Sequence, residues 1–169
     1  MFFVKTDWRQ HMIFFFFFDG GMLVVLFVML LLAVVGVLQQ ALPVISVILW
    51  IIFGLSAALS AYLTLFDSET SIPRRIINFI VNAVAYVFIG LVLAAYIGSL
   101  NKAMDMGGIN GFFEFILVGI FGAVELMLVS VGLAYAGFYL VDDDANLPYG
   151  GRLAIAVAAL GIATKLLFF

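Results

Sequence analysis

The sequence predicts an all-α fold: a polytopic transmembrane helical bundle with about five membrane-spanning helices and its N-terminus inside. Of the 169 residues, 67% are hydrophobic and only 10% are charged, whereas a soluble domain is about half apolar and about a quarter charged. Several apolar stretches reach the roughly 20 residues that a helix needs to cross a bilayer. Only short segments connect them, which makes consecutive helices antiparallel neighbours in one compact bundle.

The first 20 residues are expected to form a cytoplasmic or interfacial segment before the first membrane helix. Asp19 precedes two glycines, and an aspartate at such a point is a good helix N-cap followed by a flexible turn. The run Phe14 to Phe18 would then lie at the interface or pack on a partner. The alternative is one long helix from Met12 that carries Asp19 inside, although a charge in lipid is costly. No small-x-small cleavage motif follows the long apolar run, so a retained helix is favoured over a signal peptide.

Residues 21–169 are expected to form a single bundle, with Pro43 as a favourable first residue of its second helix. The positive-inside rule then gives the orientation. With the N-terminus inside, most of the basic residues lie inside and Lys102 lies outside. The five helices are expected at residues 21–39, 43–66, 76–100, 112–141 and 152–169, and the inside residues are Lys5, Arg9, Arg74, Arg75 and Arg152.

Glu125 is the principal candidate for a functional residue because it falls near the middle of the fourth predicted helix. A carboxylate at that depth must be paired, protonated or hydrated. It could relay protons or cations, but a structural or inter-subunit contact is the favoured interpretation. Lys165 lies at a comparable depth in the fifth helix and could form an ion pair with Glu125. The simpler alternative is that Lys165 extends its ammonium to the outer interface.

Three further polar residues are candidate interaction sites within the membrane. Glu114 shares a helix face with Glu125 but is expected at the outer interface, where a helix N-terminus favours a carboxylate. Asn78 and Asn82 lie with Arg75 and Tyr86 on one stripe of the third helix. Such a stripe faces protein or water rather than lipid. It could line an aqueous half-channel, but hydrogen bonds to neighbouring helices are the favoured interpretation.

Small residues at four-residue spacing indicate close helix contacts. They are Gly90 with Ala94 and Gly98, Ala57 with Ala61, Gly132 with Ala136, and Ala154 with Ala158.

Other chemistry is not expected. A net charge of -3 without basic clusters argues against nucleic-acid partners. No cofactor or metal is expected: Asp142–Asp144 lacks the alternating pattern of a calcium loop, and His11 is a lone histidine. The glycine-rich loop at residues 106–111 lacks the lysine of a phosphate loop. The sequence contains neither a Ser/His/Asp set nor an HExxH motif, so an enzyme is not expected.

These observations favour an integral membrane subunit of a larger membrane protein complex, with a structural, assembly or stabilising role. The expected partners are the lipid bilayer and other membrane subunits. One alternative is a transporter or channel subunit with Glu125 in a proton or cation pathway. A second alternative is a small homo-oligomeric pore-former or tetraspan-like membrane protein.

Overall fold

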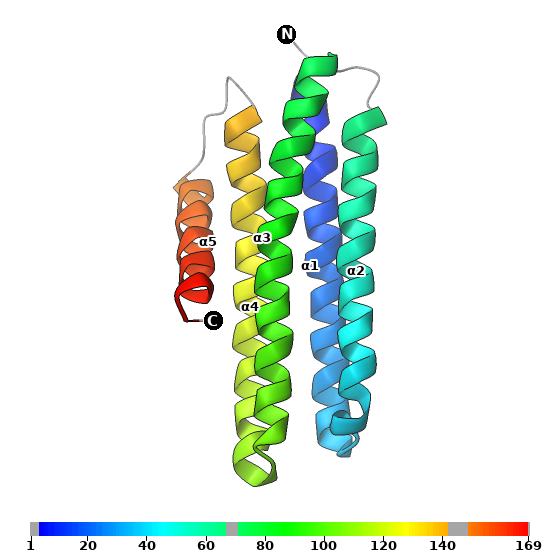
Figure 1. Ribbon diagram of the computed structural model, residues 1–169, viewed down its shortest axis with the longest axis vertical. Helices are drawn as coiled ribbons and strands as arrows, with labels where there is room; N and C mark the ends of the chain where they lie inside the picture. Colours follow the sequence, from blue (N-terminus) through cyan, green and yellow to red (C-terminus); the bar gives the residue numbers. More distant parts are fainter. Residues whose placement is uncertain (1–3, 67–70, 142–148, 169) are drawn as a thin grey trace.

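The computed structural model describes residues 4–66, 71–141 and 149–168, which form five α-helices without any strand. Four of them contain described segments that are long and apolar enough to cross a membrane, whereas the described apolar part of the first helix, Phe17–Ala33, is shorter. The predicted all-α membrane bundle is therefore confirmed. The helices are α1 (Val4–Val35), α2 (Leu38–Phe66), α3 (Ile72–Asp105), α4 (Gly108–Val141) and α5 (Tyr149–Phe168) (Figure 1).

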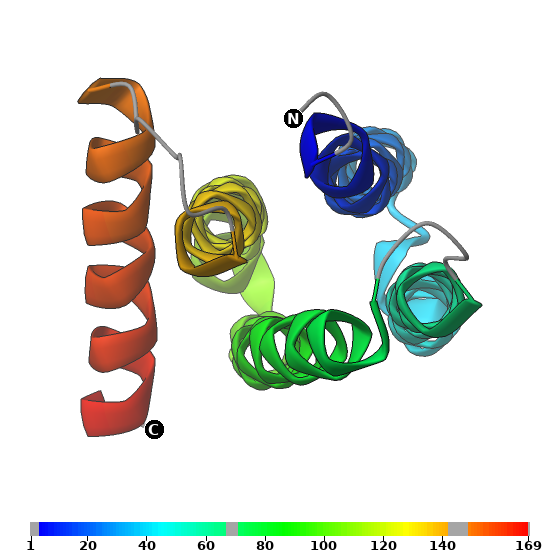
Figure 2. The ribbon, with the colours of Figure 1, turned by 90° about the horizontal axis from the view of Figure 1, so that it is seen from above.

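The first four helices form an antiparallel bundle in which each helix contacts two others. α1 packs on α2 and α4, and α3 packs on the same two helices, so the four close into a ring. α5 lies outside the ring against α4 and the edge of α3. Figure 2 looks along the bundle and shows α1 to α4 nearly end-on but α5 along its length. α5 therefore crosses α4 at a steep angle, and in Figure 1 it ends part-way along the bundle.

The first helix begins earlier in the chain than the sequence analysis predicted. α1 runs from Val4 to Val35 without a break at Asp19, so the expected helix start after Asp19 is wrong and the alternative of one long helix is right. Asp19 is buried among the other helices rather than exposed to lipid. A turn at this depth would leave several backbone N–H and C=O groups without partners in an apolar medium, which costs more than burying one carboxyl group.

The turn between the first two helices also differs from the prediction, because it lies at Gly36 rather than near Gln40. Gly36 has a φ of 80°, a conformation that glycine adopts without steric cost. The N–H of Val37 donates to the carbonyl of Leu32, and the N–H of Gly36 donates to that of Ala33. This pair of bonds is a Schellman motif, which satisfies the last carbonyls of α1. α2 consequently begins at Leu38, and Pro43 lies inside it.

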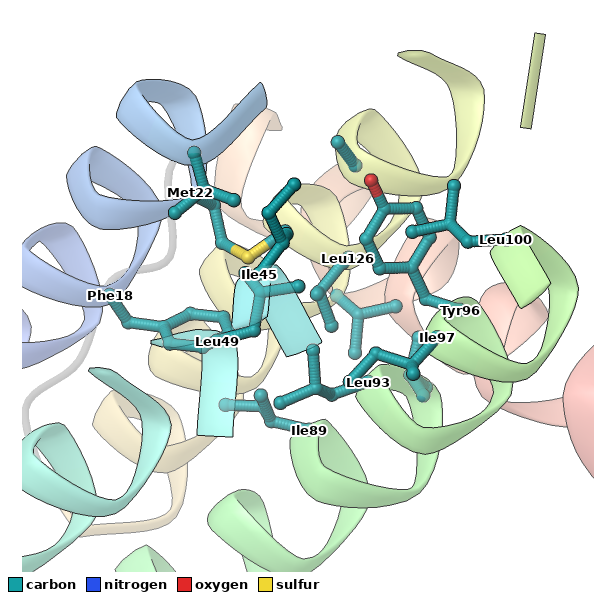
Figure 3. Close-up of a cluster of buried hydrophobic side chains, with 14 of the residues drawn as sticks. Phe18, Met22, Ile45, Leu49, Ile89, Leu93, Tyr96, Ile97, Leu100 and Leu126 are labelled. Carbon is teal, nitrogen blue, oxygen red and sulfur yellow. The ribbon is translucent and has the colours of Figure 1, made fainter. Parts of the chain in front are cut away.

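The core of the ring is divided along its length into an apolar half and a polar half. Near the α1–α2 and α3–α4 turns, the interior is filled by apolar side chains such as Met22, Leu49, Leu93 and Leu126 (Figure 3). Tyr96 lies among them and donates a hydrogen bond from its hydroxyl to the carbonyl of Gly119 at 3.1 Å. Towards the other end of the bundle, buried serine, threonine, asparagine and aspartate side chains lie among apolar ones such as Phe15 and Ala134.

Candidate functional site

Glu125 and Lys165 are brought together at the contact between α4 and α5. The Lys165 Nζ lies 3.2 Å from the Glu125 Oε2. Lys165 therefore does not extend away from Glu125 to an interface, which was the simpler expectation. Glu125 lies at the centre of α4, a helix of 34 residues, so the ion pair is about 25 Å from either end of that helix at 1.5 Å per residue.

The α4–α5 contact owes its closeness to small residues. A Cβ atom at Gly132 would clash with the carbonyl oxygen of Ala154 and with the Cβ of Ala158. Likewise, a Cβ atom added at Gly161 would lie 3.0 Å from the side chain of Val129 and 3.7 Å from the carboxylate of Glu125. The predicted small-residue pair in α5, Ala154 with Ala158, is thus a packing face. It brings the α5 backbone near enough for Lys165 to reach Glu125.

The ion pair is only partly covered by the rest of the chain. Lys165 keeps 21% and Glu125 30% of its side-chain surface exposed. Beside Lys165 is an apolar pocket of about 290 Å³ between α3 and α5, lined also by Leu91, Val92, Ala95, Ile162 and Leu166. A charged pair with this exposure near the centre of an apolar helix is unusual, because ionised groups in hydrocarbon are costly.

The other predicted candidates separate into two places. Glu114 is exposed in the second turn of α4 and lies well away from the ion pair along the helix. Asn78 and Asn82 are buried in the polar half of the ring. The polar stripe of α3 was expected to hydrogen-bond to neighbouring helices, and two of its members do so. The Nδ2 of Asn82 donates to the hydroxyl of Ser60 in α2. The hydroxyl of Tyr86 lies 2.8 Å from that of Ser56.

The α2 side of this polar region was missed in the sequence analysis. Ser56, Ser60 and Thr64 recur every four residues on one face of α2, and all three are buried. Thr64 donates to the backbone carbonyl of Ser60 at 2.7 Å. The same four-residue spacing relates Asn78, Asn82 and Tyr86 in α3, so two matching stripes were present in the sequence.

Asp19 is the other residue that sequence reasoning placed wrongly. It projects from α1 into the ring, is only 8% exposed, and approaches the hydroxyl of Ser130 in α4. It also lies within electrostatic reach of Tyr86. Helical spacing could have indicated this burial, because Phe15, Phe18, Asp19 and Met22 fall on one helix face and all are buried. The ring therefore contains a buried carboxyl group near side chains of α3 and α4.

No group of three or more His, Cys, Asp or Glu side chains that could hold a metal ion occurs within residues 4–66, 71–141 and 149–168. Asp142–Asp144 and the side chain of His11 lie outside what the structure describes. Comparisons of the chain with protein-family models, with curated proteins and with solved structures found no match.

Proposed function

We propose that this chain is a non-catalytic subunit of a larger membrane protein complex, in which it stabilises the arrangement of other membrane helices. The observation that carries this proposal is the partly exposed ion pair between Glu125 and Lys165 at the centre of α4. If the exposed part of the pair faced acyl chains, its charged groups would lie next to hydrocarbon, which is unfavourable. Covered by a partner helix, it would be screened from hydrocarbon and could accept further hydrogen bonds.

The surface beside the ion pair has the character of a helix-docking site. Leu91, Ala95 and Leu166 line the pocket next to Lys165. Ala94 and Gly98 lie on the same side of α3, are exposed, and extend this surface along the helix. These residues together form what we call the α3–α5 face. Small residues permit the close backbone approach on which helix association in lipid depends, so the occupant we propose is a transmembrane helix of another subunit.

The transporter or channel alternative receives less support from the geometry. Glu125 points to α5 and not into the ring, and between it and Glu114 the shared helix face carries Val118, Phe121 and Gly122. None of these side chains can carry a proton. A structural contact therefore explains Glu125 with fewer assumptions than a proton relay does.

The test is co-purification of the full chain from its native membrane in a mild detergent. The key variant is Gly98→Phe, which places a bulky side chain on the α3–α5 face. Gly54→Phe in α2 is the matched control, because both glycines are exposed, helical and without any neighbour within 4 Å of an added Cβ. We expect stoichiometric membrane subunits with the wild type and the control but not with Gly98→Phe.

Two outcomes would contradict the proposal. A thermally stable, monodisperse monomer without stoichiometric partners would remove its basis. A homogeneous homo-oligomer that dissociates in the Gly98→Phe variant would instead support the small pore-former or tetraspan-like alternative.

A further inference from the structure

Unsatisfied oxygen atoms in the polar half of the ring suggest that a ligand belongs there. Among the described residues, Oδ1 of Asp19, Oγ of Ser130 and Oδ1 of Asn82 are buried without a hydrogen-bond partner. A buried polar group left unpaired loses its hydration without a compensating hydrogen bond, which is unfavourable. Asp19 and Ser130 lie close together across the α1–α4 contact, so the unpaired Oδ1 and Oγ atoms belong to neighbouring side chains.

The charge of Asp19 is a second and separate problem. The groups from other helices that are known to approach it within the described chain are neutral: the hydroxyl of Ser130 in α4 and the phenol of Tyr86 in α3. Lys165 is paired with Glu125 at the α4–α5 contact, and α5 does not pack on α1 within the described chain. An ionised carboxylate in this position would be an uncompensated charge inside a membrane protein, which is strongly unfavourable.

We propose that Asp19, Ser130 and Tyr86 form an intramembrane binding site for one monovalent cation. The cation is either a proton carried by the Asp19 carboxyl group or Na⁺ held by these oxygens. Both ligands neutralise the carboxylate. Either one also provides the partner that the Asp19 oxygen lacks, because a protonated carboxyl is a donor and Na⁺ prefers hard oxygen ligands such as carboxylates and hydroxyls.

The hydrogen-bonding side chains near this site lie on one side of it along the bundle. On one side lie Ser60 and Asn82, followed by Thr64 and Asn78, so hydrogen-bonding groups continue towards the start of α3. On the other side the interior is closed by apolar side chains, among them Met22, Leu93 and Leu126 (Figure 3). The site is therefore a blind binding site that holds its cation between α1 and α4, and not part of a continuous pathway through the bundle.

The experiment uses the full chain in lipid nanodiscs, with thermal unfolding and infrared spectroscopy as two readouts. The wild type is compared with Asp19→Asn, which keeps the shape of the side chain but needs no cation. Glu125→Gln is the matched control, because it removes the other central carboxylate. Each variant is measured across a pH series in choline chloride and again with NaCl at the same ionic strength.

For a bound proton, we expect a carboxylic-acid carbonyl band in the wild type and in Glu125→Gln but not in Asp19→Asn. NaCl would leave this band unchanged, and raising the pH would remove it and lower the unfolding temperature. For bound Na⁺, NaCl but not choline chloride would raise the unfolding temperature and abolish any such band, again only where Asp19 is present. Asp19→Asn should fold in all conditions. It can therefore be measured directly whether its unfolding temperature no longer depends on pH or on Na⁺.

The proposal is overturned if the wild type shows no acid band in choline chloride and its unfolding temperature does not respond to Na⁺. It is equally overturned if Asp19→Asn retains the same dependence on pH or Na⁺ as the wild type. In either case the unpaired oxygens would not be the sign of a bound cation.

Discussion

Gly132 in α4 lies directly against α5, where the carbonyl oxygen of Ala154 and the Cβ of Ala158 both occupy the place that a side chain at Gly132 would need. No side chain larger than hydrogen fits between the two helices at this point. A second close contact lies nearby along the same pair of helices, where a Cβ at Gly161 would come within 3.0 Å of Val129. The position of Lys165 relative to Glu125 is a consequence of these contacts.

Replacing Gly132 with leucine should displace α5. Overpacking of a tight contact typically costs about 1–3 kcal/mol, and the α4–α5 contact should weaken by an amount in this range. The chain contains no cysteine, so a Val129→Cys/Gly161→Cys pair reports the distance between the helices through its disulfide yield. We expect a high yield in the parent and a low one with Gly132→Leu. Gly54→Leu, in open space on α2, should leave the yield unchanged; equal yields in all three would contradict this packing.

The hydrogen bond between Ser56 and Tyr86 should couple α2 to α3 by a modest free energy. Hydrogen bonds between membrane helices contribute about 0.6 kcal/mol on average and up to about 1.7 kcal/mol. A double-mutant cycle with Ser56→Ala and Tyr86→Phe isolates this contribution, because the phenylalanine retains the stacking on Phe15. We expect a coupling free energy near the average value in reversible unfolding from mixed micelles. Strict additivity of the two substitutions would show that the hydroxyl groups do not interact.

The sequence was sufficient for the class of fold and for the number of helices. Both follow from the length and spacing of apolar stretches, which the bilayer thickness constrains directly. Helix ends were less predictable, since α3 and α4 each have 34 residues, about 50 Å, against a hydrocarbon core of about 30 Å. Their polar end turns remain helical beyond the apolar stretch that composition can detect.

The sequence was not sufficient to identify which polar groups meet. Asp19 has the local pattern of an N-cap, and only the rotation of α1 within the ring turns it towards Ser130. The pairing of Asn82 with Ser60 likewise depends on which faces of α2 and α3 oppose each other. The close contact of α4 with α5 also depends on Gly132 opposing Ala154 and Ala158. Such relationships depend on packing between helices, which a single sequence does not specify.

The orientation of the chain in the membrane is a prediction that cysteine labelling can test. The first turn of α3, with Arg74 and Arg75, lies at the opposite end of the ring from Lys102. By the positive-inside rule, the end with the two arginines is inside. Ser71→Cys and Tyr149→Cys should therefore react with an impermeant thiol reagent from the inside, and Asn110→Cys from the outside. All three positions are exposed; labelling of Ser71→Cys and Asn110→Cys from the same side would contradict the prediction.

The ion pair between Glu125 and Lys165 predicts that either single substitution lowers stability more than the double substitution does. Lys165→Leu leaves Glu125 as an isolated charge, and the cost of one charge near a helix centre is about 2.5 kcal/mol or more. Glu125→Leu leaves Lys165 in the same situation, although its longer side chain can reach an interface and reduce the cost. The double variant Glu125→Leu/Lys165→Leu removes both charges, and replacing an ion pair with apolar residues is often neutral or stabilising.

We therefore expect both single variants to unfold at lower temperature than the wild type in nanodiscs, and the double variant to recover most of the loss. The unfolding temperature of Glu125→Gln should lie between those of the wild type and Glu125→Leu. Its amide oxygen can still accept a hydrogen bond from the Lys165 ammonium, but the amide carries no charge. A double variant less stable than either single one would show that the two side chains act independently, and that the 3.2 Å contact does not hold α5 against α4.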